Sequence, residues 1–154
     1  MKAFVTAITF TILLGAMPDP AAALAAEAAS SAAERIMEQS GVEGGLVVHL
    51  HCGDGRLTAT LRATDAYLVQ GLDTQEKNVD RARKHFRAVG IHGPVSAARF
   101  DGRTLPYADE LVNLVVAERL GDVPMEEVLR VLAPEGVACI KKGDSWTTTV
   151  KPRP

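Results

Sequence analysis

Short apolar runs alternate with amphipathic segments along most of the chain. Aliphatic and β-branched residues dominate five runs of strand length, over residues 46–50, 67–72, 95–100, 111–117 and 137–140. Continuous apolar runs of this length are typical of strands that are buried on both faces of a parallel sheet. Apolar residues at helical spacing predict helices over residues 27–39, 57–63, 75–89 and 125–132.

Strands that alternate with helices predict an α/β fold, here a Rossmann-like, doubly wound parallel sheet. Right-handed crossovers give the strand order 3-2-1-4-5. We expect this domain to cover residues 26–141. Residues 142–154 contain threonines and two prolines without clear periodicity, and we interpret them as a linker or a truncated tail.

The N-terminus has the pattern of an export signal. Lys2 is the only charged residue before Asp19, and an apolar run over residues 3–17 is too short for a membrane span of about 20 residues. Ala23-Leu24-Ala25 fits the small-x-small rule for cleavage. We predict a signal peptide over residues 1–25 and an exported chain, periplasmic or secreted; the alternative is an uncleaved anchor or an ordinary apolar helix.

The amino-acid composition restricts the class of protein further. The chain has 154 residues, 47% of them hydrophobic and 23% charged, with a net charge of -2, which indicates one globular domain and excludes a strongly basic nucleic-acid binder. Cys52 and Cys139 lie in predicted strands that are not neighbours. We therefore expect both cysteines to be free and buried.

Ligands of an open parallel sheet bind outside the carboxyl ends of its strands. The segment His51-Cys52-Gly53-Asp54-Gly55 follows the first predicted strand, and its glycines let a ligand approach the backbone. The alternative is a tight turn without a ligand.

Asp73 ends the second predicted strand, where a carboxylate can accept hydrogen bonds from a ribose. The alternative is a helix cap, since Thr74 and a helical segment follow.

Acidic residues also follow the next two strands. Asp101 with Gly102 follows the third strand and could accept the exocyclic amine of an adenine, or could form an ordinary Asp-Gly turn. Glu118 follows the fourth strand, where it faces the reacting end of a cofactor or forms a solvated charged pair with Arg119.

Other cofactors fit these residues less well. A dinucleotide fingerprint requires a third glycine where Thr58 stands, which disfavours NAD and FAD. The chain has no phosphate-binding G-x-x-x-x-G-K-[ST] loop. His49 and His51 share a strand face, but the other histidines lie on distant elements, so we predict no metal site.

The order of these motifs resembles the class I S-adenosylmethionine-dependent methyltransferases. Residues 47–55 (VVHLHCGDG) resemble the family's V-L-D-L-G-C-G-x-G motif, and Asp73 matches the acidic residue that ends the second strand. Residues 100–116 resemble the region of the third and fourth strands, and residues 127–137 resemble the E-x-x-R-V-L-x-P-G-G segment. The resemblance extends over about residues 44–141.

The resemblance implies a cofactor site for S-adenosylmethionine. Gly53 and Gly55 would contact the methionine part, Asp73 the ribose and Asp101 the adenine. The wider predicted cofactor site consists of His49, His51, Gly53, Asp54, Gly55, Asp73, Thr74, Asp101, Gly102 and Glu118. The resemblance identifies neither a catalytic residue nor the methyl acceptor.

The chain departs from the family pattern at several positions. His49 replaces an acidic residue that helps hold the cofactor's amino group, His51 replaces the first glycine, and Asn113 stands where Asp is frequent. We also expect the family's terminal antiparallel hairpin to be absent. The amino-acid sequence further resembles the methyltransferase-like N-terminal region of exported bacterial quinoproteins, in which a β-propeller follows.

Three hypotheses follow. The first is a methyltransferase-like domain that binds S-adenosylmethionine and transfers its methyl group. The second is a degenerate, non-catalytic module in which the cofactor is lost, favoured by the two histidines and by export away from the cytosol. The third is an NAD-binding domain, which Thr58 disfavours.

Overall fold

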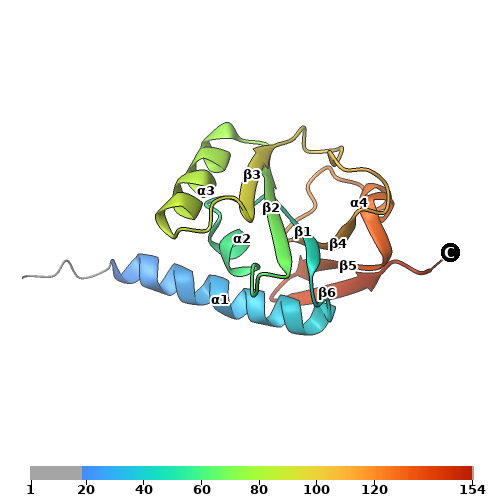
Figure 1. The fold of residues 1–154 in the computed structure, drawn as a ribbon, viewed down its shortest axis with the longest axis horizontal. Coiled ribbons are helices and arrows are strands. Elements are labelled where there is room, and N and C mark those ends of the chain that lie inside the picture. Colours follow the sequence, from blue (N-terminus) through green and yellow to red (C-terminus); the bar gives the residue numbers. More distant parts are fainter. Residues whose placement is uncertain (1–18, 154) are drawn as a thin grey trace, which may run out of the picture.

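A computed structural model describes residues 19–153 and shows one mixed sheet with helices on both faces (Figure 1). Its six strands lie in the order β3-β2-β1-β4-β5-β6. The strands are β1 (Gly45–Leu50), β2 (Tyr67–Asp73), β3 (Val95–Arg99), β4 (Val112–Ala117), β5 (Leu132–Lys142) and β6 (Ser145–Val150). The helices are α1 (Pro20–Ser40), α2 (Arg56–Thr60), α3 (Glu76–Ala88) and α4 (Met125–Val131).

The predicted strand order 3-2-1-4-5 is confirmed, and these five strands are parallel. The predicted absence of a terminal hairpin was wrong, because β6 pairs antiparallel with β5. Gly143, at φ +60°, allows the tight turn between Lys142 and Ser145. The residues expected to form a linker thus include a strand, whose run of threonines favours extended backbone.

Helix α1 begins earlier than its sequence pattern predicted. Asp19 caps it by accepting a hydrogen bond from the Ala21 amide at 3.0 Å, and Pro20 suits the first helical position. Ser31 lies inside α1 and accepts a hydrogen bond from Arg35.

The predicted signal peptide falls largely outside the described residues, which exclude 1–18. Helix α1 runs without interruption through the predicted cleavage position at residues 23–25. Over the part of the chain that is described, none of the helices combines the length and the apolar character that a membrane crossing requires.

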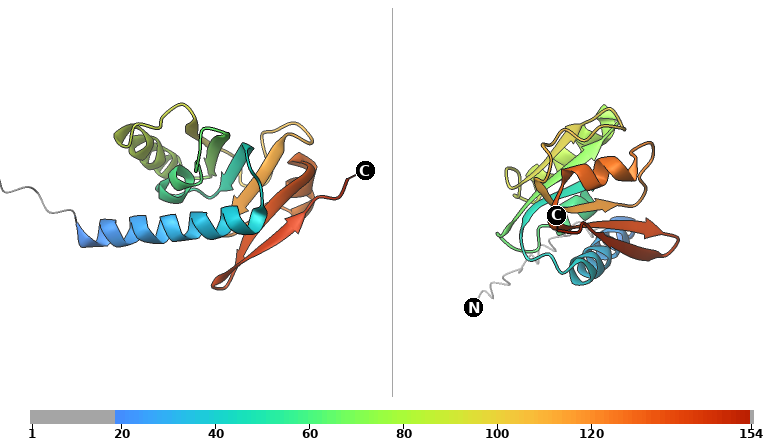
Figure 2. Two further views of the ribbon diagram at one scale, coloured as in Figure 1. Left: turned by 60° about the horizontal axis from the view of Figure 1, so that its bottom comes forward. Right: turned by 90° about the vertical axis from the view of Figure 1, so that its right-hand side faces the viewer.

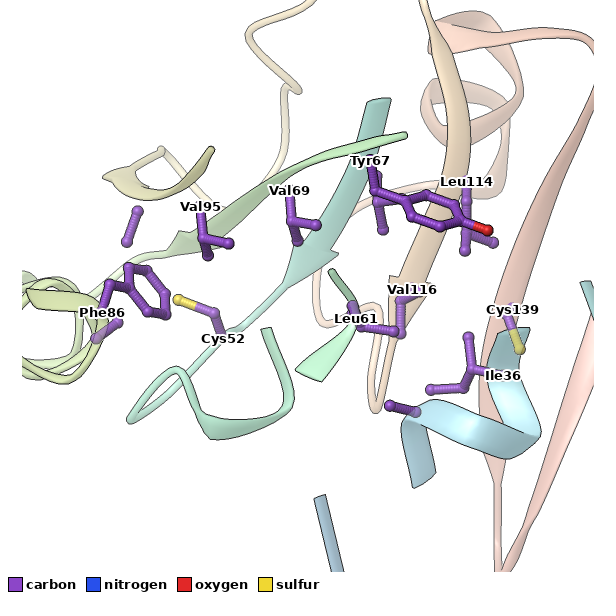
Figure 3. Packing of buried hydrophobic residues seen from close by; sticks show 14 of the residues in the cluster. Ile36, Cys52, Leu61, Tyr67, Val69, Phe86, Val95, Leu114, Val116 and Cys139 are labelled. Atoms are coloured by element: carbon purple, nitrogen blue, oxygen red, sulfur yellow. The ribbon is translucent and has the colours of Figure 1, made fainter. Parts of the chain in front are cut away.

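Helices α1, α2 and α3 cover one face of the sheet, where Figure 3 shows side chains from β2, β3, β4 and β5 packed together. Ile36 of α1 and Phe86 of α3 are fully buried in this layer. Cys52 and Cys139 are also buried here and form no disulfide, as predicted. Burial raises the pKa of Cys52 to about 12 and that of Cys139 to about 11, so both stay protonated thiols at neutral pH.

The opposite face has a thinner cover, made by the seven-residue helix α4 and the segment between β3 and β4. Leu105 and Val128 are buried against this face, whereas Leu68 on β2 remains 60% exposed. The crossover from β3 to β4 has no helix of its own.

Candidate cofactor site

The loop after β1 lies at the switch point of the sheet, where β1 has β2 on one side and β4 on the other. Its backbone takes up left-handed conformations at three positions, with φ values of 56° at His51, 57° at Gly53 and 81° at Gly55. This loop, Asp73 at the end of β2 and Asp101 after β3 therefore lie along one edge of the sheet, as the sequence predicted.

The two loop glycines have different environments. A Cβ atom added at Gly53 would meet no heavy atom within 4 Å, so the backbone there is open to a ligand. A Cβ atom added at Gly55 would lie 2.8 Å from Ala82 and from Phe86 of α3. Gly55 thus allows α3 to pack against the loop, whereas only Gly53 has the exposure that a backbone contact to a cofactor requires.

Asp73 connects the loop to the start of α3. One carboxylate oxygen accepts a hydrogen bond from the Gly53 amide at 3.0 Å, and the other accepts from the Gln75 amide at 2.9 Å and from the Asn78 side chain at 3.1 Å. Asp73 is not the helix cap of its alternative interpretation, because Gln75 is the N-cap of α3 and has no side-chain capping bond. Asp73 instead closes the turn that leads into α3, and it is only 3% exposed. A carboxylate has about four acceptor positions, so one position on the Gly53 side remains for a ribose hydroxyl.

Asp101 forms the turn that was its alternative interpretation. One of its oxygens accepts hydrogen bonds from the Arg103 and Thr104 amides at 2.8 and 2.7 Å. These backbone donors lower the pKa of the Asp101 carboxyl, which stays ionised at neutral pH. The Asp101 side chain is exposed to solvent at this position. The Thr74 methyl group lies close to Gly102, so the turns after β2 and β3 are in contact.

His51 bridges two loops at this edge. Its ring packs edge-on against Phe100, with centroids 5.8 Å apart, and its Nε2 lies 3.4 Å from the Leu120 carbonyl oxygen after β4. The left-handed φ at His51 favours glycine, since a side chain there strains the backbone. The imidazole partly fills the space between the ends of β3 and β4.

His49 lies inside the molecule, beneath α2. Its Nδ1 forms a 2.8 Å hydrogen bond with the Thr58 hydroxyl, and its Nε2 is buried without a partner among residues 19–153. Burial, together with the neighbouring His51, lowers the pKa of His49 to about 4 despite the opposing influence of Asp73. His49 is therefore neutral at pH 7 and cannot replace the negative charge of an acidic residue.

Two predicted site residues have surface partners instead. Asp54 accepts hydrogen bonds from the Arg56 amide and from Arg56 Nε at 3.0 Å each, beside Gly55, the N-cap residue of α2. Glu118 is exposed and lies 3.6 Å from Lys141 of β5, not paired with Arg119 as the alternative had it. Within residues 19–153, no group of three or more His, Cys, Asp or Glu side chains could hold a metal ion.

Arg130 braces the segment between β3 and β4, a role that was not predicted from the sequence. Its guanidinium donates to the carbonyl oxygens of Leu105 and Tyr107 at 3.1 and 3.0 Å. It also pairs with Glu127 at 2.7 Å and with Asp109 at 2.6 Å. The Glu-x-x-Arg spacing was the sequence signal for this ion pair, because residues three apart lie on one helix face. The pair supports the loop that carries Asp101.

Comparison with known proteins identifies the family. A family described as a methyltransferase domain matches residues 47–136, which is more than half of the chain. The chain belongs to this family. The match includes the loop after β1, Asp73, Asp101 and Arg130 of α4. Methyltransferases of this family use S-adenosylmethionine.

Two curated methyltransferases are similar in sequence. Methyltransferase GfsG of Streptomyces halstedii is 31% identical over 136 residues, which cover 83% of this chain and 49% of that protein. Demethylmenaquinone methyltransferase of Lactobacillus johnsonii is 32% identical over 101 residues, which cover 60% of this chain and 41% of that protein. The chain thus spans about half the length of the curated relatives that it matches.

Solved structures show the same fold at lower identity. Geranyl diphosphate C-methyltransferase from Streptomyces coelicolor, solved with S-adenosyl-L-homocysteine, has a TM-score of 0.66 at 20% identity over 72% of this chain and 44% of that one. A SAM-dependent methyltransferase from Aquifex aeolicus has a TM-score of 0.63 at 20% identity over 73% and 67%. The [4+2]-cyclase SpnF has a TM-score of 0.67 at 24% identity over 74% and 44%, so the fold alone does not fix the reaction.

The residues at the edge of the sheet fit S-adenosylmethionine at most positions. Gly53 leaves open space beside the backbone, and Asp73 and Asp101 each keep acceptor capacity after their internal hydrogen bonds. His51 is the departure, because its ring occupies space at this edge.

Proposed function

We propose that this chain binds S-adenosylmethionine along the edge formed by Gly53, Asp73 and Asp101, and that it supports methyl transfer to an acceptor that is still to be identified. The hydrogen bond from the Gly53 amide to Asp73 carries the proposal most directly. It joins the open turn of the glycine loop to the carboxylate that ends β2, which are the two parts of a nucleoside site in this type of sheet.

The residues would share the work of binding. Asp73 would accept a ribose hydroxyl while it holds the loop and α3 in place, and the free oxygen of Asp101 would accept the adenine amine. When bound, the cofactor supplies an electrophilic methyl group on its sulfonium. Transfer then depends on aligning the acceptor with that methyl group, and no residue of the chain is assigned as a general base.

A non-catalytic module that has lost the cofactor is the competing function, and the His51 ring favours it. The two functions predict different affinities for S-adenosyl-L-homocysteine in the unmodified chain and in a variant without the ring. If His51 only narrows the site, S-adenosyl-L-homocysteine binds the unmodified chain, and His51→Gly binds it more tightly.

Titration calorimetry with S-adenosyl-L-homocysteine tests the proposal. We expect saturable binding, weakened at least about tenfold by Asp73→Asn because a charged hydrogen-bond acceptor contributes roughly 1.5–3 kcal/mol. Asp65→Asn is the matched control, since Asp65 is an exposed carboxylate that precedes β2 and pairs with Arg62. Absence of heat at millimolar ligand for both the unmodified chain and His51→Gly would exclude the cofactor site.

We further propose that residues 1–25 direct export and that a β-propeller follows this domain in a longer protein. The apolar N-terminal run supports the first proposal, and the sequence resemblance supports the second. Mass spectrometry of the chain from a bacterial periplasmic fraction should show cleavage after Ala25. An intact N-terminus in the cytosolic fraction contradicts export.

A further inference from the structure

The two edges of the sheet differ in how they are protected. β3 forms one edge; Pro94 precedes it and the charged Arg99 ends it, both of which discourage further strand pairing. β6 forms the other edge with the sequence SWTTTV, which contains no charge and no proline. Figure 2 shows the β5–β6 hairpin at the margin of the molecule, beside α1.

Among residues 19–153, the backbone groups on the outer side of β6 have no hydrogen-bond partner. Lys151 donates its amide to the Gly136 carbonyl and accepts from the Glu135 amide, so its backbone groups face β5. Because backbone direction alternates along an antiparallel strand, Thr149 and Thr147 also face β5. The N–H and C=O groups of Trp146, Thr148 and Val150 therefore point away from the sheet.

The side chains leave this edge accessible. Residues 147–150 are all exposed, and only Trp146 is buried, at 9% exposure, beneath the layer that includes α1. Val150 is 57% exposed, so its aliphatic side chain is accessible at this edge. An uncharged strand of β-branched residues with free backbone groups is a template for another strand.

We propose that β6 is a self-association surface, at which β6 of a second copy of this chain pairs antiparallel with it about a two-fold axis at Thr148. The register follows from two conditions. Residues whose backbone groups point outward must lie opposite such residues of the second copy, which allows only every second register. Centring the pair on Thr148 places the exposed Val150 opposite Trp146 of the second copy, an aromatic and β-branched pair of a favourable kind.

Charge and interface size are consistent with a weak dimer. In this register Asp144 lies opposite Pro152 of the second copy, between the basic residues Lys151 and Arg153, and no like charges are opposed. A six-residue strand pair buries less than the roughly 1,200–2,000 Å² of a stable complex, so association should depend on concentration. It continues the sheet from six to twelve strands across the two copies.

Hydrogen exchange and sedimentation of the chain test this surface. As concentration rises from about 10 µM to about 1 mM, a range suited to weak interfaces, we expect the mass to approach that of a dimer. The amides of Trp146, Thr148 and Val150 should exchange more slowly over the same range. Those of Thr147 and Thr149 should be protected throughout, because they bond to β5.

A matched pair of variants locates the contact. Thr148→Lys places two cations opposite each other at the axis and should abolish the dimer, whereas Ser96→Lys adds the same charge on β3 at the other edge and should leave it intact. A monomer at every concentration overturns the proposal. So does a dimer that persists unchanged in Thr148→Lys, because association would then use another surface.

Discussion

His49 and His51 are two residues apart and both depart from the family's first motif, yet the structure gives them opposite environments. His49 is 2% exposed, hydrogen-bonded to Thr58 and uncharged. His51 is partly exposed, has a left-handed backbone and spans the ends of β3 and β4. The first substitution lies in the interior that supports the loop, whereas the second lies in the space that a ligand would use.

This comparison separates stability from binding within one motif. Changes at His49 should act mainly on the free energy of unfolding, because its ring fills a buried space. Changes at His51 should act mainly on ligand affinity, because its ring faces the edge where Gly53 is open. Equal effects of both histidines on both quantities would remove the distinction.

The largest expected effect is the loss of stability in His49→Ala. The substitution leaves a cavity beneath α2 and deprives the Thr58 hydroxyl of its partner, so we expect a loss of about 4 kcal/mol. Urea unfolding measures it, with the exposed His92→Ala as a control that should change stability by less than about 0.5 kcal/mol. A loss below about 1 kcal/mol for His49→Ala would show that the buried ring is dispensable.

Substitutions of Gly53 and Gly55 should also differ in their effect on the free energy of unfolding. Gly55→Ala forces a Cβ atom against Ala82 and Phe86 and requires a side chain at φ +81°, so we expect about 3 kcal/mol of destabilisation. Gly53→Ala meets open space and should cost only about 1 kcal/mol, from its left-handed backbone. Thermal unfolding of both variants measures the difference, and the reverse order would contradict the assigned roles.

The pH dependence of stability should report on His49. Its folded pKa of about 4 lies below the ordinary value of 6.5, so the unfolded chain binds the proton first as pH falls. Stability from this residue is constant above pH 6.5 and declines between pH 6.5 and 4, by about 2 kcal/mol at pH 5. His49→Asn keeps a polar side chain that cannot titrate, and urea unfolding of this variant should lack that decline.

The smallest expected change in stability belongs to His51→Gly. Relief of the left-handed side chain should raise the free energy of unfolding by about 1 kcal/mol or less. Affinity for S-adenosyl-L-homocysteine should rise in the same variant, because the ring no longer occupies the edge. Unchanged affinity would place the ring outside the ligand's path.

Much of this fold could be predicted from the sequence, because buried parallel strands have distinctive apolar runs. The strand order and the shared edge of Gly53, Asp73 and Asp101 followed from those runs and from right-handed crossovers. β6 was missed because its threonines, exposed on both faces, show no alternation. The roles of Gly55 and His49 depend on α3 and on Thr58, which are contacts that local spacing does not reveal.

Amide chemical-shift mapping with S-adenosyl-L-homocysteine tests the proposed site most directly. In ¹⁵N-labelled protein, the largest changes should occur at Gly53, Thr74 and Gly102, with small changes at His92 and on β6. Largest changes elsewhere, for instance in the 310 Å³ groove that is lined by Arg56 and His85 and lies among α1, α2 and α3, would contradict the site. An unchanged spectrum at millimolar ligand would contradict cofactor binding itself.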